Sequence, residues 1–455
     1  MLRSTPGRWW RCIGRLSTSR SIASSIGSLK LDEFLYYAAF ACCALAGDLQ
    51  LTSLVRSGYV WVQSFVFLLQ ISACLLLAFK LFAFQRYTTK QLVFVAVLSL
   101  VALLSYYFSR DSLVMLSILF VIAGKGVSLK NLAKIEFVVT ICILIIAFVG
   151  DATGILESIV MDGRDGVRGI RRSMGFDHPN SLGIALVKIC VAAFAIGGSE
   201  GLSVGLILSA FSAVMTIVAS DSRTALIGLG LLVLLFVVRK AVLNRHLGAS
   251  IFLGTIIGLA GFSILMSLYF TVYYSASNPT HAYLNELLTG RLKLASWYYG
   301  LYPPSLFGQD VSVFPLIYMY GGAKTSHFVV DNAISHLLIQ YGYVPCGLML
   351  LGALLLFRKA WKERCICTLV IAFAFAAIHG FSEYYFIRFD FNYFMLAFSY
   401  VLYDVPLSEP KCELFLNEIV NISPGPNLSF SAIPHLGLLQ KSADNSSRYF
   451  IGRDA

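Results

Sequence analysis

The fold follows from stretches such as YVWVQSFVFLLQISACLLLAF, which runs from Tyr59 to Phe79 without a charged residue. An α-helix needs about 20 apolar residues to cross the hydrocarbon core of a bilayer, and this stretch has that length. Comparable apolar runs recur along the 455 residues and lack the alternation of barrel strands. Because lipid offers no partner to an open backbone, these runs predict an all-α polytopic membrane protein.

The composition supports this class. The chain is 58% hydrophobic and only 13% charged, with a mean hydropathy of +0.76, whereas soluble domains carry about 25% charged residues. The net charge of +11 has a simple source in basic loops that stay on the cytoplasmic side of a membrane. The composition therefore excludes a soluble enzyme and a nucleic-acid-binding protein.

We predict twelve transmembrane helices. Their approximate bounds are Phe34–Leu54, Tyr59–Phe79, Gln91–Phe108, Ser112–Ser128, Glu136–Gly150, Ser181–Gly197, Leu202–Ser220, Thr224–Val238, Ser250–Val272, Ala333–Phe357, Ile366–Tyr385 and Asn392–Tyr403. They define a membrane domain at residues 31–404. A basic cytoplasmic tail at 1–30 precedes it, and a Pro/Ser/Asn-rich cytoplasmic tail at 405–455 follows it. The first tail also has the composition of a mitochondrial transit peptide.

The distribution of positive charge predicts the orientation. If the N-terminus is cytoplasmic, about two thirds of the 35 lysines and arginines lie in inner segments. The positive-inside rule therefore favours cytoplasmic N- and C-termini. Two long loops, 151–180 and 273–332, then lie outside the membrane, and most of the remaining arginines are found in them.

The most polar stretch of the chain, RDGVRGIRRSMGFDHPNSLG, spans Arg164 to Gly183 in the first of these loops. Guanidinium groups bind phosphate bidentately and keep their charge. We expect arginines from three segments to converge on an anionic ligand at the outer surface. These are Arg168, Arg171, Arg172, Arg223 and Arg291. The alternative is that they pair with nearby aspartates or contact lipid headgroups.

The end of this stretch, His178-Pro179-Asn180, has two explanations. Proline is common at the first position of a helix, and Asn180 or Ser181 could cap the helix that follows. His178 has no such structural explanation in the sequence. It could bind a sugar hydroxyl or a phosphate, or it could transfer a proton.

Five further positions are candidates for the site. Lys188 lies two turns into the sixth span, where a cation is costly unless it extends to the interface or binds a ligand. Trp297 could anchor the second loop in the interface or stack on a sugar. Asp331 or His327 could act as a general base. Asp331 and Asn332 could instead cap the tenth span.

The order of these motifs resembles a known family. The chain has R-S-x-G-F-x-H-P-N-x-L-G from Arg172 to Gly183, S-R at Ser222-Arg223, G-R-x5-W from Gly290 to Trp297, and D-N at Asp331-Asn332. In this order and on one side of the membrane, they resemble the Wzy-type polysaccharide polymerases, which belong with the O-antigen ligases. The resemblance covers roughly Arg168 to Asn392.

The resemblance implies a glycosyltransferase of the C-type architecture in the bacterial cell membrane, without a metal or other cofactor. Its substrate would be a polyprenyl-diphosphate-linked glycan, which it transfers onto another lipid-linked repeat unit on the extracytoplasmic side. The catalytic residues that we expect are Arg223, Arg291, Asp331 and His327. The expected substrate-binding residues are Arg168, Arg171, Arg172, His178, Asn180, Lys188, Trp297 and Asn332.

Two alternatives remain. A ligase would transfer the glycan to a final acceptor, but ligases tend to have histidine where this chain has Asp331, which favours a polymerase. A flippase of the lipid-linked unit would show repeated halves and charges deep in several spans, and the sequence offers only Lys188. Expected partners are membrane lipid, a chain-length regulator and flippase proteins, and no nucleic acid.

Overall fold

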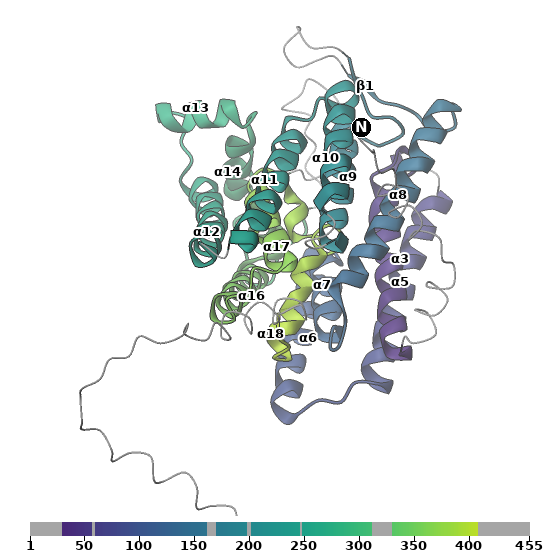
Figure 1. Ribbon diagram of the computed structural model, residues 1–455, viewed down its shortest axis with the longest axis vertical. Coiled ribbons are helices and arrows are strands. Elements are labelled where there is room, and N and C mark those ends of the chain that lie inside the picture. The colour runs from purple at the N-terminus through teal and green to yellow at the C-terminus, as the bar shows by residue number, and fades with distance from the viewer. Residues whose placement is uncertain are drawn as a thin grey trace, which may run out of the picture. The chain divides into compact units, whose positions relative to one another are not determined.

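The computed structural model describes residues 30–56, 60–161, 170–197, 202–245, 248–311 and 330–407. Within these ranges, eight helices are long and apolar enough to cross a membrane. They are α5 (Val60–Ala83), α6 (Thr89–Ser109), α8 (Leu129–Ala152), α9 (Pro179–Gly197), α10 (Leu202–Met215) continued by the π-helical turn η1 (Thr216–Ser220), α11 (Arg223–Arg245), α12 (Ala249–Tyr273) and α16 (Tyr343–Lys362). The protein is therefore a mostly helical, multi-pass membrane protein (Figure 1).

The other four predicted spans are shorter or interrupted. They contain α3 (Leu31–Gln50) with α4 (Ser53–Arg56), α7 (Leu113–Ala123), α17 (Thr368–His379) with the 3₁₀ turn η4 (Tyr384–Ile387), and the 3₁₀ turn η5 (Tyr393–Ala397) with α18 (Phe398–Leu402). In the tenth span, α15 (Ala333–His336) and the π-helical η3 (Leu337–Tyr341) precede α16. The tenth span, predicted as one helix, is divided at Gly342. This glycine has φ 87°, and a Cβ there would lie 2.4 Å from the Ser305 carbonyl oxygen.

The two predicted loops also carry regular structure. In the first, β1 (Val160–Met161) pairs antiparallel with β2 (Arg171–Arg172), so that Met161 lies opposite Arg171. In the second, α13 (Pro279–Leu287) and α14 (Arg291–Leu301) follow α12. The N-terminal segment 1–29 and the C-terminal segment 408–455 lie outside the described residues.

Helix α9 is the central helix of the bundle. An 18-residue window of α9 is 83% buried, whereas the corresponding windows of α5 and α6 are 22% buried. Helix α9 packs against α8, α10, α11 and α17, and Figure 1 shows α8 and α10 beside it. Small residues permit this close packing, because a Cβ at Gly183 would lie 2.9 Å from Ala225 and one at Gly205 would lie 2.5 Å from Phe194.

The segments predicted to be cytoplasmic contact one another. The Lys125 ammonium donates to the Arg86 carbonyl at 2.8 Å, and the Gln85 amide donates to the Ala123 carbonyl at 2.8 Å. Lys359 forms an ion pair of 2.9 Å with Asp404 beyond α18. One end of the bundle thus collects several inner segments of the predicted topology.

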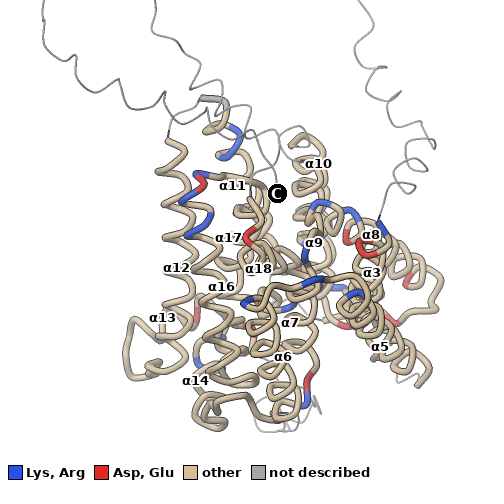
Figure 2. Tube along the Cα trace, turned by 90° about the horizontal axis from the view of Figure 1, so that it is seen from below, with Lys and Arg blue, Asp and Glu red and all other residues tan. Residues whose placement is uncertain are grey.

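The segments predicted to be outside also contact one another. Ser53 donates its backbone N–H to the Gly175 carbonyl at 2.9 Å, and Phe108 stacks on Phe307 with ring centroids 6.5 Å apart. Most of the trace carries neither acidic nor basic residues, as the tan colour in Figure 2 shows. The candidate site is found at this second end.

Candidate functional site

The site is built around the first turn of α9. Pro179 is the first helical residue, where its missing N–H costs no hydrogen bond. The His178 Nδ1 atom accepts a hydrogen bond from the Asn180 backbone N–H at 3.0 Å. His178 therefore caps the helix, a role that the sequence suggested for Asn180 or Ser181. The Asn180 Oδ1 atom is instead bound by the Arg171 Nη2 atom at 2.8 Å.

The two arginines of β2 differ in their surroundings. Arg171 is buried, and its Nε atom donates to the Ser220 carbonyl at 2.9 Å. Arg172 is exposed, because successive side chains of a strand point to opposite faces. Arg223, the first residue of α11, is exposed as well. The arrangement thus presents Arg172 and Arg223 at the surface and uses Arg171 to join three segments.

Arg291 is the centre of a second cluster. It follows Gly290, whose φ of 88° turns the chain into α14, and its side chain is buried. Its Nε atom lies 3.0 Å from Asp331 Oδ2, its Nη2 atom lies 3.2 Å from Glu383 Oε1, and its Nη1 atom donates to the Ser382 carbonyl. Burial opposes the charged form, but the Glu383 and Asp331 carboxylates raise the pKa of Arg291 above its usual value.

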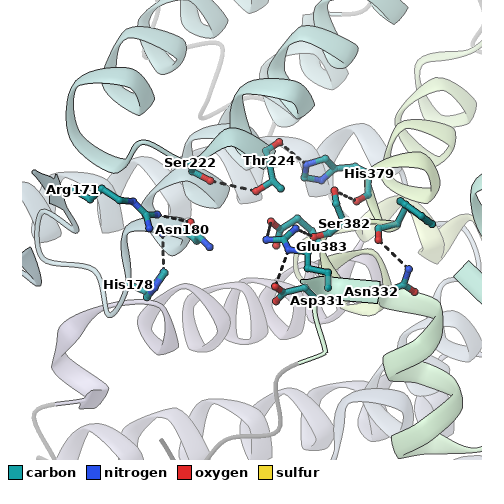
Figure 3. Close-up of polar contacts among 12 residues, drawn as sticks. Arg171, His178, Asn180, Ser222, Thr224, Asp331, Asn332, His379, Ser382 and Glu383 are labelled. Carbon is teal, nitrogen blue, oxygen red and sulfur yellow. Dashed lines mark hydrogen bonds and ion pairs between the residues drawn. The ribbon is translucent and has the colours of Figure 1, made fainter. Parts of the chain in front are cut away.

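A series of polar contacts leads from Ser222 to the residues around Arg291. The Ser222 and Thr224 hydroxyls lie 3.4 Å apart, and the His379 Nε2 atom donates to the Thr224 carbonyl at 3.2 Å. The Ser382 hydroxyl donates to the His379 carbonyl at 3.2 Å. In Figure 3, Arg171, His178 and Asn180 lie on one side of the site, and Asp331, Asn332 and Glu383 lie on the other. Five segments that are distant in sequence therefore lie at one end of the bundle.

Asn332 has a structural role at the edge of the site. Its Oδ1 atom accepts from the Ser335 backbone N–H at 3.0 Å, which confirms it as the cap of α15. Its Nδ2 atom donates to the Ser267 hydroxyl at 2.9 Å and to the Phe381 carbonyl at 3.0 Å. Asp331 does not share this role, because its carboxylate pairs with Arg291.

Lys188 does not lie with the other candidates. It is at the middle of α9, where its ammonium lies 2.5 Å from Asp48 Oδ1 and also contacts Glu136 Oε1. All three side chains are buried. The prediction that Lys188 is the only charge deep in a span is therefore wrong, because single acidic residues of α3 and α8 accompany it.

The remaining candidates are placed as follows. Trp297 lies on α14 with 38% of its surface exposed, and its ring is edge-on to Tyr298 at 5.0 Å. Arg168 and His327 lie outside the described residues. The sequence did not assign Glu383 to the site, nor the Ser222 and Thr224 hydroxyls. A carboxylate near the outer end of an apolar run was the available signal for Glu383.

Within the described ranges, no three His, Cys, Asp or Glu side chains are grouped so that they could hold a metal ion. The polar groups that the site offers are instead guanidinium, carboxylate, imidazole and hydroxyl groups. Such groups can bind an anion and accept a proton. No family model, no curated protein and no solved structure matches this chain.

Proposed function

We propose that this protein is a membrane glycosyltransferase that polymerises lipid-linked oligosaccharide repeat units. It transfers a glycan from a polyprenyl diphosphate onto the terminal sugar of another lipid-linked unit. The observation that carries the proposal is the convergence of arginine, carboxylate and histidine side chains from five segments at one end of a membrane bundle. The resemblance in the order of the motifs supplies the substrate class.

The reaction is a substitution at an anomeric carbon. The acceptor hydroxyl forms the new C–O bond, the bond to the diphosphate breaks, and the diphosphate leaves with the electron pair. Exposed Arg172 and Arg223 are suited to stabilise its growing negative charge. Asp331, with 26% of its side chain exposed, is suited to take the proton of the acceptor hydroxyl. Arg291 holds that carboxylate in place.

The burial of the arginines supports this division of roles. The guanidinium groups of Arg171 and Arg291 are bonded to protein groups, and both side chains are buried. These two arginines therefore hold the other side chains of the site in position.

The orientation with the site outside a bacterial cell membrane rests on the positive-inside rule. In this mechanism, the charge of the arginines takes the place of a metal ion.

The first test is Arg223→Ala in cells that make the polysaccharide. We expect the long polymer to disappear while the amount of membrane-inserted protein stays unchanged, because the variant removes an exposed charge at the start of α11. Arg110→Ala is the matched control. Arg110 is also an exposed arginine next to a helix end, and its guanidinium lies over the Tyr107 ring at 5.2 Å. An Arg223→Ala strain with polymer of normal length contradicts the proposed site.

A deletion strain distinguishes the related functions by the size of its lipid-linked glycans. A polymerase leaves single repeat units on the carrier. A ligase leaves long polymer that does not reach its final acceptor. Purified protein that keeps its activity in excess chelator would agree with arginine-based charge stabilisation, and metal dependence would contradict it.

A transporter of lipid-linked oligosaccharide is the second candidate. It is favoured by the buried cluster of Asp48, Glu136 and Lys188, because ionisable side chains inside a membrane are expensive and often mark transport pathways. In that case the deletion strain would lack repeat units on the outer side of the membrane, whereas a polymerase deletion would retain them there.

A further inference from the structure

A cluster of charged side chains lies inside the membrane domain, apart from the candidate site. Asp48 of α3, Glu136 of α8 and Lys188 of α9 are all buried. The Lys188 ammonium contacts one oxygen of each carboxylate. The Thr140 hydroxyl, one turn after Glu136, lies 3.0 Å from Asp48 Oδ2 and 3.1 Å from Glu136 Oε1. Three helices are thus joined by one cation and two acids.

A second ion pair adjoins this cluster. Arg388 binds Asp390 through two contacts of 3.1 and 2.6 Å. Both cations lie over the Phe391 ring, with the Lys188 ammonium 4.3 Å and the Arg388 guanidinium 4.8 Å from the ring centroid. Asp390 packs directly against α3, because a Cβ on Gly47 would lie 1.8 Å from its Oδ2 atom.

The charges of this cluster do not balance. The elements packed against α8 are α3, α9 and η5. The titratable groups on these elements that interact with Glu136 are Asp48 of α3, Lys188 of α9 and Tyr393 of η5. Asp390, in the segment before η5, also interacts with Glu136. With Arg388 included, three carboxylates face two cations. One negative charge is in excess if every carboxylate is ionised, and an uncompensated charge is very costly in such surroundings.

The hydrogen bonds indicate which carboxylate carries the excess negative charge. Both oxygens of Asp48 have partners, namely Lys188 and Thr140. Among the described residues, Glu136 Oε2 has no hydrogen-bond partner, although it is buried. The buried Tyr393 hydroxyl also lacks a hydrogen-bond partner in that part of the chain, and it interacts electrostatically with Glu136.

We propose that Glu136 is a proton-binding site within the membrane domain, with the proton carried on Oε2 at neutral pH. The proton removes the excess charge, and a neutral acid costs less to bury without a partner than a carboxylate does. Asp48 stays ionised and keeps Lys188 as its counter-ion. Lys188 of this cluster and His379 of the candidate site line the same cavity.

Infrared spectroscopy of the full-length protein in lipid tests this assignment without any substrate. We expect a carbonyl stretch of a protonated carboxylic acid at pH 7 that shifts in D₂O. The band should shift when the protein is made with ¹³C-labelled glutamate and stay unchanged with ¹³C-labelled aspartate. It should be absent from Glu136→Gln. If the wild-type protein lacks such a band, or if the band persists in Glu136→Gln, the proposal is overturned.

Two further variants keep the test decisive if Glu136→Gln does not fold. Glu136→Asp keeps the acid and should shift the band, and Asp48→Glu changes the neighbouring acid by the same methylene and should not. The opposite pattern would place the proton on Asp48 and overturn the proposal. Thermal unfolding adds a second measurement. Glu136→Gln resembles the protonated acid and should unfold at about the wild-type temperature, whereas Asp48→Asn should unfold well below it. Equal losses for both variants would indicate that Glu136 is ionised.

Discussion

Replacing Arg291 with alanine should destabilise the protein, because the buried Glu383 carboxylate would then lack its counter-ion. Arg291 binds Glu383, whose side chain is only 4% exposed, and Asp331, which is 26% exposed. Removing one partner of a buried ion pair costs about 3–5 kcal/mol, whereas an exposed pair contributes about 0–1 kcal/mol. We therefore expect Arg291→Ala to lose about 3–5 kcal/mol. Of the two carboxylates that it leaves behind, the buried Glu383 accounts for most of the electrostatic part of this loss.

The double variant Arg291→Ala/Glu383→Gln separates charge from packing. It removes the uncompensated charge, so it should regain about half of the lost stability, roughly 2 kcal/mol. Asp331→Asn is the control, since its carboxylate is more exposed, and it should cost no more than about 1–2 kcal/mol. Unfolding of purified protein in detergent with increasing denaturant, followed by circular dichroism, measures the three variants and the wild type. A double variant no more stable than Arg291→Ala would refute the charge argument.

The deep cluster and its closest glycine give two further predictions. Lys188→Met should cost about 3–5 kcal/mol, because Asp48 loses its counter-ion, and adding Asp48→Asn should restore part of that loss in the same unfolding measurement. Gly47→Ala should cost about 1–3 kcal/mol, since its Cβ overlaps the Asp390 carboxylate. Gly261→Ala, at a helical position with nothing within 4 Å of the added Cβ, should be neutral or slightly stabilising and serves as its control.

The long apolar runs were predictable because burial in lipid imposes one length and one polarity on a helix. Tyr59–Phe79 and the helix Val60–Ala83 agree closely. The division of the tenth span at Gly342 was not predictable from hydropathy, which does not distinguish a straight helix from one broken by a left-handed glycine. The break depends on the Ser305 backbone, which comes from a distant part of the chain.

The candidate site was predictable by residue type more than by role. Arg171 and Arg172 are neighbours of equal charge in the sequence, and only the pairing of β2 decides which of them is buried. Asp48 and Glu136 were overlooked because each is a single acid in an apolar run. Their importance appears only when three helices bring them to one lysine.

The arginines of the candidate site need to be separated by what they bind before any of them is assigned to a substrate. A buried guanidinium that already serves Asp331, Glu383 and a carbonyl has few donors left for a phosphate, since it carries five N–H groups in a fixed geometry. An exposed one keeps its charge where a diphosphate would meet it. In the proposed mechanism, the motifs therefore supply two kinds of arginine. One kind is buried and positions other side chains, and the other is exposed and binds the substrate. Arg291 holds Asp331, the proposed general base, in position, and Arg223 binds the diphosphate.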